Sequence, residues 1–290
     1  GSGALEISGN FARTSGTVVP QAFSRLSIAQ ATGDLSPGAL SVAGPVELQA
    51  SNGALLFTAP ITGTTVFGLG QAGVRFSGDA VLTATAAIAS DGTGRTIALA
   101  SGLNPQLLPS TNPGGFLNTS TAGVAALNVA PGAWWELYTT DPAISPSSAL
   151  AGLPYAFKQY GKLPMDGLPV AQSGNGLFYA STPTLAVSLA ASPLVSKTYD
   201  ATTAATLSSA NYSLSGVVTG DSVLLAAGSA SYDDANVGTA KRVAFSGITV
   251  SSASETATGR PVYGYQLPLA TSLSGAIGTI GKAPLQVTAT

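Results

Sequence analysis

The chain has 290 residues, of which 45% are hydrophobic and only 8% are charged, with 35 Gly, 18 Pro, no Cys and no His. An ordinary soluble domain is about one quarter charged, so hydroxyl, amide and backbone groups must keep this chain in solution. Without Cys and His the chain cannot form a disulfide, a thiolate metal site or a histidine-activated nucleophile. The 11 basic and 13 acidic residues nearly balance, which predicts no nucleic-acid partner and no anionic-membrane partner.

The length suits one or two domains. No run of about 18 apolar residues occurs, so we expect no membrane insertion. The first residues, GSGALEIS, lack a basic stretch followed by an apolar one, so we expect no signal peptide in them.

Short strands are predicted from residue 4 to about residue 130. Apolar residues alternate, between turn residues, in ALEIS, RLSIA, ALSVAG, VELQA, ALLFTA, GVRFSG, AVLTAT and TIALAS. Equivalent positions recur about every twenty residues, as from Leu5 to Leu26 to Val46. A β-sandwich and a right-handed parallel β-helix both fit this pattern, and the many small residues favour the β-helix for residues 1–130.

Residues 131–180 differ because aromatic side chains gather there. The open end of a stack of β-coils exposes apolar interior and unpaired strand edges, and bulky side chains cover both. We therefore interpret this segment as an aromatic cap. Its aromatic residues are Trp134, Trp135, Tyr138, Tyr155, Phe157, Tyr160, Phe178 and Tyr179.

Short strands return in residues 181–290 without the twenty-residue spacing. They are predicted at 184–190, 205–207, 211–217, 222–226, 240–249 and 262–268, with a closing strand in 282–290. Strand signals about ten residues apart are typical of an immunoglobulin-like β-sandwich. The whole chain is thus predicted to be all-β, with a β-helix, a cap and an immunoglobulin-like module.

An ordered series of segments carries a family resemblance: WWELYTTDP, GLPYAFKQYGK, GNGLFYA, VSKTYDATTAAT, GVVTGDSV, SYDDANVGTAKRV and VYGYQL. The series resembles the C-terminal region of filamentous haemagglutinin-like exoproteins of two-partner secretion systems, where YDG-type modules follow a β-helical shaft. The resemblance covers residues 131–290. It implies export through an outer-membrane transporter, a secreted or cell-surface location, and a role in cell attachment or biofilm formation.

The resemblance also assigns a set of motif residues to the module. In the family a Gly follows Tyr-Asp, whereas Ala201 stands here, so we expect no positive φ at this position. We expect Tyr199 to pack inward and Asp200 to fix a turn through its carboxylate. The motif residues are Lys197, Tyr199, Asp200, Thr202, Gly220, Asp221, Tyr232, Asp233, Gly238, Tyr263, Gly264 and Tyr265.

Asp200, Asp221, Asp233 and Asp234 suggest two interpretations. They converge on one Ca²⁺ ion, which needs six to eight oxygen ligands, or each caps its own turn. Their spacing matches neither an EF-hand loop nor a nonapeptide repeat, which favours separate turns. We therefore expect no cofactor, with calcium as the alternative.

Trp134, Trp135 and Tyr138 also suggest two interpretations. Flat aromatic faces stack well on sugar rings, which suggests host-surface or exopolysaccharide glycans as partners. Adjacent residues of a strand point to opposite faces, so one of the two Trp side chains is expected to pack inside. That expectation favours a structural role in the cap.

Catalysis by paired carboxylates is the remaining class. No local motif groups the acidic residues of the first 180 positions, so we expect the chain not to be an enzyme. The leading hypothesis is a structural, adhesive segment of a large secreted bacterial adhesin. The alternatives are a carbohydrate-binding module and a polysaccharide-degrading β-helix enzyme. The acidic residues are Glu6, Asp34, Glu47, Asp79, Asp91, Glu136, Asp141 and Asp166.

Overall fold

The computed structural model describes residues 4–9, 24–104, 106, 109, 113–164, 170–226, 228–268 and 272–285, and Glu6 is the one described side chain of residues 4–9. Strands dominate these residues, and the helices among them are short 3₁₀ turns at Gly123–Ala125, Ser147–Leu150 and Ser209–Asn211. The prediction of an all-β chain is therefore confirmed. The described part of the chain has no helix long and apolar enough to cross a membrane.

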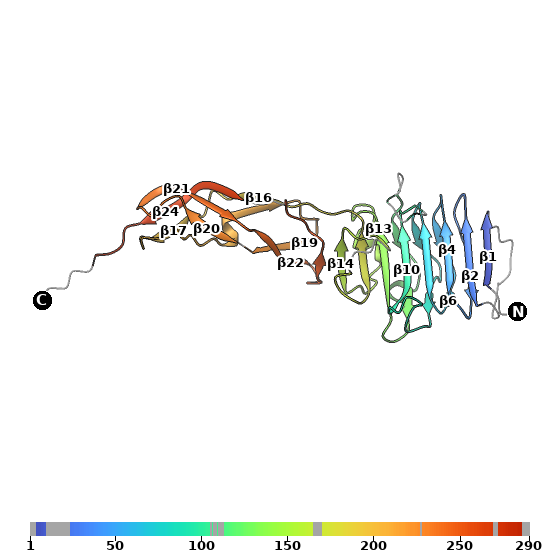
Figure 1. The fold of residues 1–290 in the computed structure, drawn as a ribbon. Helices are drawn as coiled ribbons and strands as arrows, with labels where there is room; N and C mark the ends of the chain where they lie inside the picture. The colour runs from blue at the N-terminus through green and yellow to red at the C-terminus, as the bar shows by residue number, and fades with distance from the viewer. Residues whose placement is uncertain are drawn as a thin grey trace. The chain divides into compact units, whose positions relative to one another are not determined.

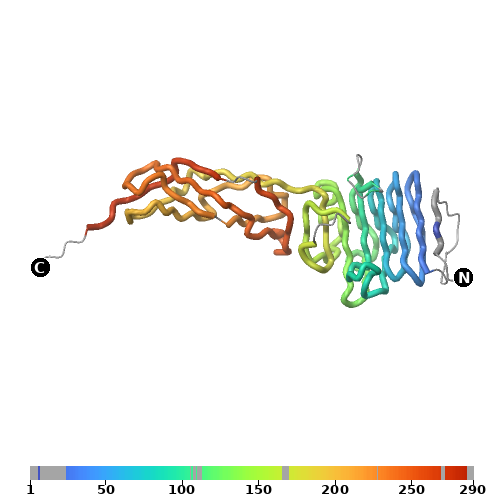
Figure 2. The backbone as a smooth tube through the Cα atoms, viewed as in Figure 1, coloured from blue at the N-terminus to red at the C-terminus, as the bar shows by residue number. Residues whose placement is uncertain are grey.

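Contacts divide the chain into two compact units, residues 1–182 and residues 183–290. Figures 1 and 2 show the strands of the first unit lying side by side along successive turns of the backbone. The strands of the first unit are β1 (Ala4–Gly9), β2 (Arg25–Gln30), β3 (Leu40–Ser41), β4 (Val46–Ala50), β5 (Leu55–Phe57), β6 (Ile61–Gly63), β7 (Val66–Gly70), β8 (Val74–Phe76), β9 (Leu82–Ala84), β10 (Arg95–Ser101), β11 (Phe116–Asn118), β12 (Leu127–Val129), β13 (Trp134–Thr139), β14 (Phe157–Tyr160) and β15 (Gly176–Tyr179).

The strands of the first unit form parallel sheets that the chain visits in turn. The largest sheet runs β1-β2-β4-β7-β10-β13-β15-β14, the second runs β11-β8-β5, and the third runs β12-β9-β6-β3. The chain passes from β4 in the largest sheet to β5 and β6 in the other two, and β7, β8 and β9 repeat this order. We call the stretch from one strand of the largest sheet to the next a coil.

Successive coils stack in register. Leu5 pairs with Leu26, Leu26 with Val46, and Val46 with Val66. The twenty-residue spacing in the sequence therefore identified residues that are neighbours in the sheet. The interior is tightly packed around Gly68 in β7. A Cβ atom at this position would lie 2.7 Å from Leu55 Cδ2 and 2.8 Å from Leu99 Cδ2, which is too close for any larger residue without a shift.

Inward-facing side chains build the core of the first unit. In the second sheet Phe57 pairs with Phe76, and their ring centroids are 4.8 Å apart. Phe116 pairs with Val74, two residues before Phe76, and its ring centroid lies 5.5 Å from that of Phe76. Residues 131–180 continue the largest sheet, since β13 pairs in parallel with β10. The chain then departs from sequence order, because β15 lies between β13 and β14.

The second unit has smaller sheets. Its strands pair as β16-β18, as β17-β24-β21-β20 and as β19-β22, and the pair β17-β24 is parallel. Its core contains Val195, Tyr232, Val243, Ile277 and Ile280. The strands are β16 (Ala186–Leu189), β17 (Val195–Thr198), β18 (Tyr212–Ser215), β19 (Asp221–Ala226), β20 (Ser229–Tyr232), β21 (Gly238–Ser246), β22 (Thr249–Glu255), β23 (Val262–Tyr263) and β24 (Leu273–Gly281).

Several predicted strands of the second unit are wrong in place or extent. Residues 205–207 are not a strand, and the predicted strand 240–249 is divided where Gly247 adopts a φ of 73° between β21 and β22. The last described strand is β24, and residues 282–285 of the predicted closing strand are outside any strand. Residues 286–290 lie outside the described residues.

Candidate functional site

The turn after β17 gathers several of the motif residues. Lys197 Nζ donates hydrogen bonds to Asp200 Oδ1 at 2.7 Å, to the Thr202 carbonyl at 2.6 Å and to Thr202 Oγ1 at 2.9 Å. The backbone N–H of Thr202 donates to Asp200 Oδ1 at 2.9 Å. The prediction that Asp200 fixes a turn through its carboxylate is therefore confirmed. The Lys197 hydrogen bond is the main cause that lowers the pKa of Asp200 to about 2.

Two expectations about this turn are wrong. Tyr199 is 42% exposed, because it follows the end of β17 at Thr198 and the alternation of the strand no longer applies. The inward aromatic side chain is Tyr232, whose hydroxyl donates to the Val195 carbonyl at 2.9 Å. Ala201 adopts a φ of 61°, so the turn keeps its left-handed conformation without the Gly.

Tyr232 also connects this turn to β20. Lys197 Nζ lies 5.5 Å from the centroid of the Tyr232 ring, a distance suited to a cation–π contact. The ring packs in the core of the second unit, and burial is the main cause that raises the pKa of its hydroxyl. Motif residues more than thirty positions apart therefore form one contact group, which we call the Lys197 turn: Lys197, Asp200, Thr202 and Tyr232.

A second group of motif residues surrounds Tyr265. Its hydroxyl donates to Asp221 Oδ2 at 2.9 Å and accepts the backbone N–H of Val218 at 3.0 Å. Gly220 and Gly264 have φ values of 91° and 90°, which residues other than Gly rarely adopt. Tyr263 is half-buried in β23, and Gly238 begins β21.

The remaining aspartates contact Lys241, whose side chain is 8% exposed. Lys241 Nζ binds Asp234 and lies 3.6 Å from Asp233 Oδ1. Its hydrogen bond is the main cause that lowers the pKa of Asp234. Together with Asp200 and Asp221, each carboxylate considered for calcium thus has a partner within the protein. Among the residues that the structure describes, no three acidic side chains are placed to hold a metal ion.

The aromatic side chains considered for sugar stacking lie in β13. Trp135 is 1% exposed and Tyr138 is 2% exposed, so both rings are covered, whereas Trp134 is half-buried. Tyr138 stacks on Phe178 with the ring centroids 4.7 Å apart. These three residues therefore do not present an exposed platform.

Glu136 holds the outward side of β13 together. Its carboxylate accepts hydrogen bonds from the Trp134 indole N–H at 3.1 Å and from the Tyr138 hydroxyl, and Arg95 Nη1 lies 3.5 Å away. Burial, followed by the charge of Glu136, raises the pKa of Tyr138. Burial is the largest single influence on Arg95 and opposes its charged form, but Glu136, Tyr138 and Asp91 together outweigh it and raise the pKa of Arg95. Glu136 therefore serves as the centre of a packed polar network.

The other acidic residues of the first unit are dispersed. Glu47 pairs with Arg25, and Asp91 Oδ2 lies 2.7 Å from Arg95 Nη2. Asp34 accepts the backbone N–H of Ala54 in the next coil, and Asp141 accepts the backbone N–H of Ala143 in its own turn. Glu6 and Asp79 are exposed, and Asp166 lies outside the described residues.

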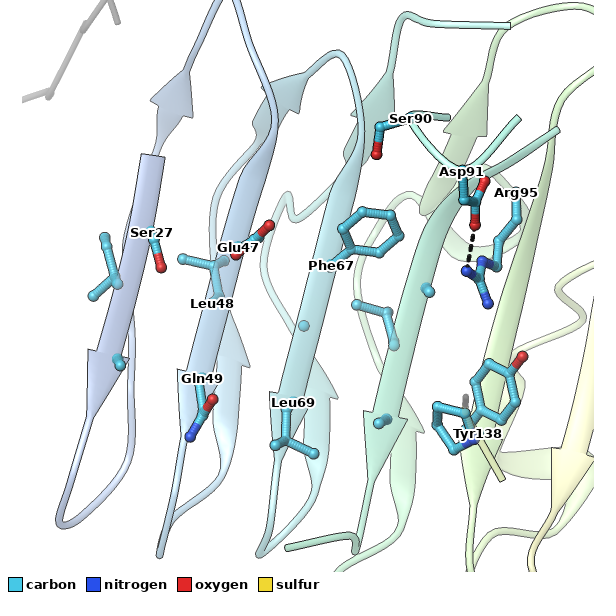
Figure 3. A pocket seen from close by; sticks show the side chains of 17 residues that line it. Ser27, Glu47, Leu48, Gln49, Phe67, Leu69, Ser90, Asp91, Arg95 and Tyr138 are labelled. Carbon is cyan, nitrogen blue, oxygen red and sulfur yellow. Dashed lines mark hydrogen bonds and ion pairs between the residues drawn. The ribbon is translucent and has the colours of Figure 1, made fainter. Parts of the chain in front are cut away.

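A hollow lies on the outward face of the largest sheet, and no pattern in the sequence predicts it. It has a volume of about 470 Å³ and crosses β2, β4, β7, β10 and β13. Figure 3 shows Phe67 and Leu69 in the middle of the lining, with Glu47 and Gln49 to one side of them and Tyr138 and the Arg95–Asp91 ion pair to the other. Only the register of the coils brings these residues together, so no local motif announces the hollow.

The fold and these contact groups define a nearly all-β protein with parallel sheets and a second unit organised around tyrosine and aspartate turns. A YDG domain is found at residues 182–258 by comparison with protein-family models. The Lys197 turn, Asp221 and Lys241 lie within the matched residues, and Tyr265 lies beyond them. No curated protein and no solved structure matches the chain.

Proposed function

We propose that the chain is a structural, non-catalytic segment of a large secreted bacterial surface adhesin that acts in cell attachment or biofilm formation. In this proposal residues 1–182 are a right-handed parallel β-helix whose end is covered by residues 131–180. Residues 183–290 are an immunoglobulin-like YDG module that follows it in the chain. An outer-membrane transporter exports the chain, which then acts at the cell surface.

The observation that carries the proposal is the in-register stacking of the coils. β2, β4, β7 and β10 each pair in parallel with the preceding strand of the largest sheet. Each added coil therefore lengthens the sheet and satisfies the backbone groups of the coil before it. A surface fibre needs this property, and it needs few charged side chains.

The YDG domain at residues 182–258 supports the second part of the proposal. Its motif residues are engaged with one another, as in the Lys197 turn and in the Tyr265–Asp221 hydrogen bond. Such contacts stabilise turns between short strands. They are what a module used for length, rather than for chemistry, requires.

The proposal is tested in the organism that makes the chain. Antibodies raised against the purified chain are expected to label intact cells, and deletion of its coding segment is expected to lower attachment to a surface. A strain with the segment restored is the control. Labelling confined to permeabilised cells would contradict export, and unchanged attachment after deletion would contradict the adhesive role.

A further inference from the structure

We propose that the hollow on the outward face of the largest sheet is a binding site for a neutral saccharide. Sugar binding here and the structural role proposed above are independent. A chain that binds no sugar could still have the structural role, and a chain without that role could still bind sugar. The proposal follows from the register of the strands, the polarity of the lining and the balance of charge.

The hollow arises from small residues on one strand between large residues on its neighbours. On β10, Ala98 pairs with Phe67 of β7, and Ala100 pairs with Leu69 of β7 and Tyr138 of β13. Ala98 therefore leaves a low floor beside the half-buried Phe67 ring, whereas Ala100, Leu69 and Tyr138 are buried. Phe67 is half-buried, so part of its ring remains accessible from the hollow.

Polar groups accompany this apolar floor. Gln49 and Glu47 of β4 are half-buried at one side, and Asp91 is exposed near the other. A sugar ring has C–H faces that pack on an aromatic ring and hydroxyl groups that need hydrogen-bond partners. Apolar surface with a few placed polar groups is the usual lining of a small-ligand site.

The charges around the hollow favour a neutral ligand. Arg25 is paired with Glu47, and Arg95 lies 2.7 Å from Asp91 and 3.5 Å from Glu136. Both arginines are thus already matched by carboxylates. An acidic sugar would meet the carboxylates of Glu47 and Asp91, and both arginines already have acidic partners, so charge disfavours it.

The position of the hollow disfavours a protein strand as its occupant. A peptide that adds to a sheet needs an edge with unpaired backbone groups. The strands that carry Phe67 and Ala98 are interior, because β7 pairs with both β4 and β10, and β10 pairs with β13. The hollow crosses five strands of the sheet, which spans about 19 Å at the usual strand spacing. That length suits an oligosaccharide.

The test measures binding of the full chain by calorimetry to neutral gluco-, manno- and galacto-oligosaccharides and to a uronic-acid oligosaccharide of equal length. We expect at least one neutral oligosaccharide to bind and the uronic-acid oligosaccharide to bind more weakly. Phe67→Ala is expected to raise the dissociation constant about tenfold, because the stacking ring is lost. Ala98→Phe is expected to abolish binding by filling the floor.

Matched controls are placed on other sheets of the same unit. Leu56→Ala removes a half-buried apolar side chain in β5, and Thr62→Phe adds a ring at a half-buried position in β6. Neither substitution is expected to change binding. Circular dichroism and melting temperature establish whether each variant is folded. If Phe67→Ala does not fold, Ala98→Phe alone tests the site.

Three results would overturn the proposal. One is the absence of binding to every neutral oligosaccharide. Another is binding that persists unchanged in folded Ala98→Phe, and the third is a preference for the uronic-acid oligosaccharide. Self-association that Ala98→Phe removes, with no sugar bound, would instead make the hollow a contact between copies of the chain.

Discussion

Ala201 holds a backbone conformation that Gly adopts at lower cost. Its φ of 61° lies in the left-handed region, where the Cβ atom of an ordinary residue costs about 1–2 kcal/mol. The turn tolerates this cost because Lys197, Asp200 and Thr202 fix it from three directions. The side-chain contacts, rather than the residue at the turn, therefore determine the conformation.

Ala201→Gly is expected to raise the free energy of unfolding of the second unit by about 0.5–1 kcal/mol. Relief of the left-handed strain exceeds the extra entropy that Gly has in the unfolded chain. Urea denaturation of the full chain measures the change. Ala244→Gly, within β21, is the matched control and is expected to destabilise by a similar amount. A loss of stability in both variants would contradict the argument.

The Asp200 carboxyl gives a prediction about pH. Its pKa is lowered to about 2 in the folded chain, from an ordinary value of 3.8. The stabilisation by the charged carboxylate is thus present above the ordinary value and is lost as the pH falls through about 2. Carboxyl NMR titration is expected to give a midpoint near 2, and Lys197→Met is expected to move it upward. An unchanged midpoint in that variant would show that Lys197 is not the cause.

Sequence reasoning at this scale succeeded where a contact is local and failed where it is not. The bond between Asp200 and the Thr202 backbone spans two residues, and turn chemistry predicts it. The contact of Lys197 with Tyr232 joins two strands, and no spacing in the sequence announces it. The prediction that Tyr199 packs inward is wrong because side chains alternate between two faces only inside a strand, and β17 ends at Thr198.

Inward side chains that pack between neighbouring coils hold the strands of the first unit together. Phe76 is fully buried between Phe57 and Phe116 in the second sheet. Each strand there has three residues, so one ring supplies a large share of what its strand buries. These three buried rings are therefore the main apolar contribution of this sheet.

Phe76→Ala is expected to destabilise the first unit by about 3–5 kcal/mol, through lost burial and the cavity that remains. Chemical denaturation of the full chain measures the effect. Arg75→Ala is the matched control, because Arg75 lies on the same strand and is exposed. It is expected to change stability by less than about 0.5 kcal/mol. Equal effects of the two substitutions would contradict the inward assignment of Phe76.

Spacing predicted the early coils well because they are uniform. Leu5 pairs directly with Leu26, and Leu26 pairs directly with Val46, as the spacing predicts. β6 and β7 were not predicted, because Gly63, Gly68 and Gly70 interrupt the apolar pattern. The sheet order β13-β15-β14 was equally hidden, since long loops remove any fixed spacing.

The division of the chain into two units gives a prediction for the whole molecule. The units separate between Thr182 and Pro183, and each has its own buried core. Phe76→Ala and Val243→Ala remove core side chains from different units, so their effects should be independent. Calorimetry is expected to show two transitions, each shifted to lower temperature by one of the two variants. A single transition that both variants shift would contradict independent unfolding.

Stacking in register also makes length easy to alter in evolution. The stretch Val46–Thr65 begins with Val46, which pairs with both Leu26 and Val66. Excision of this stretch by unequal recombination would bring Leu26 opposite Val66 and leave the register of the remaining coils unchanged. Duplication of the stretch would add one more coil in the same way. A gene built on such coils can therefore produce shorter and longer stacks of coils without any new kind of contact.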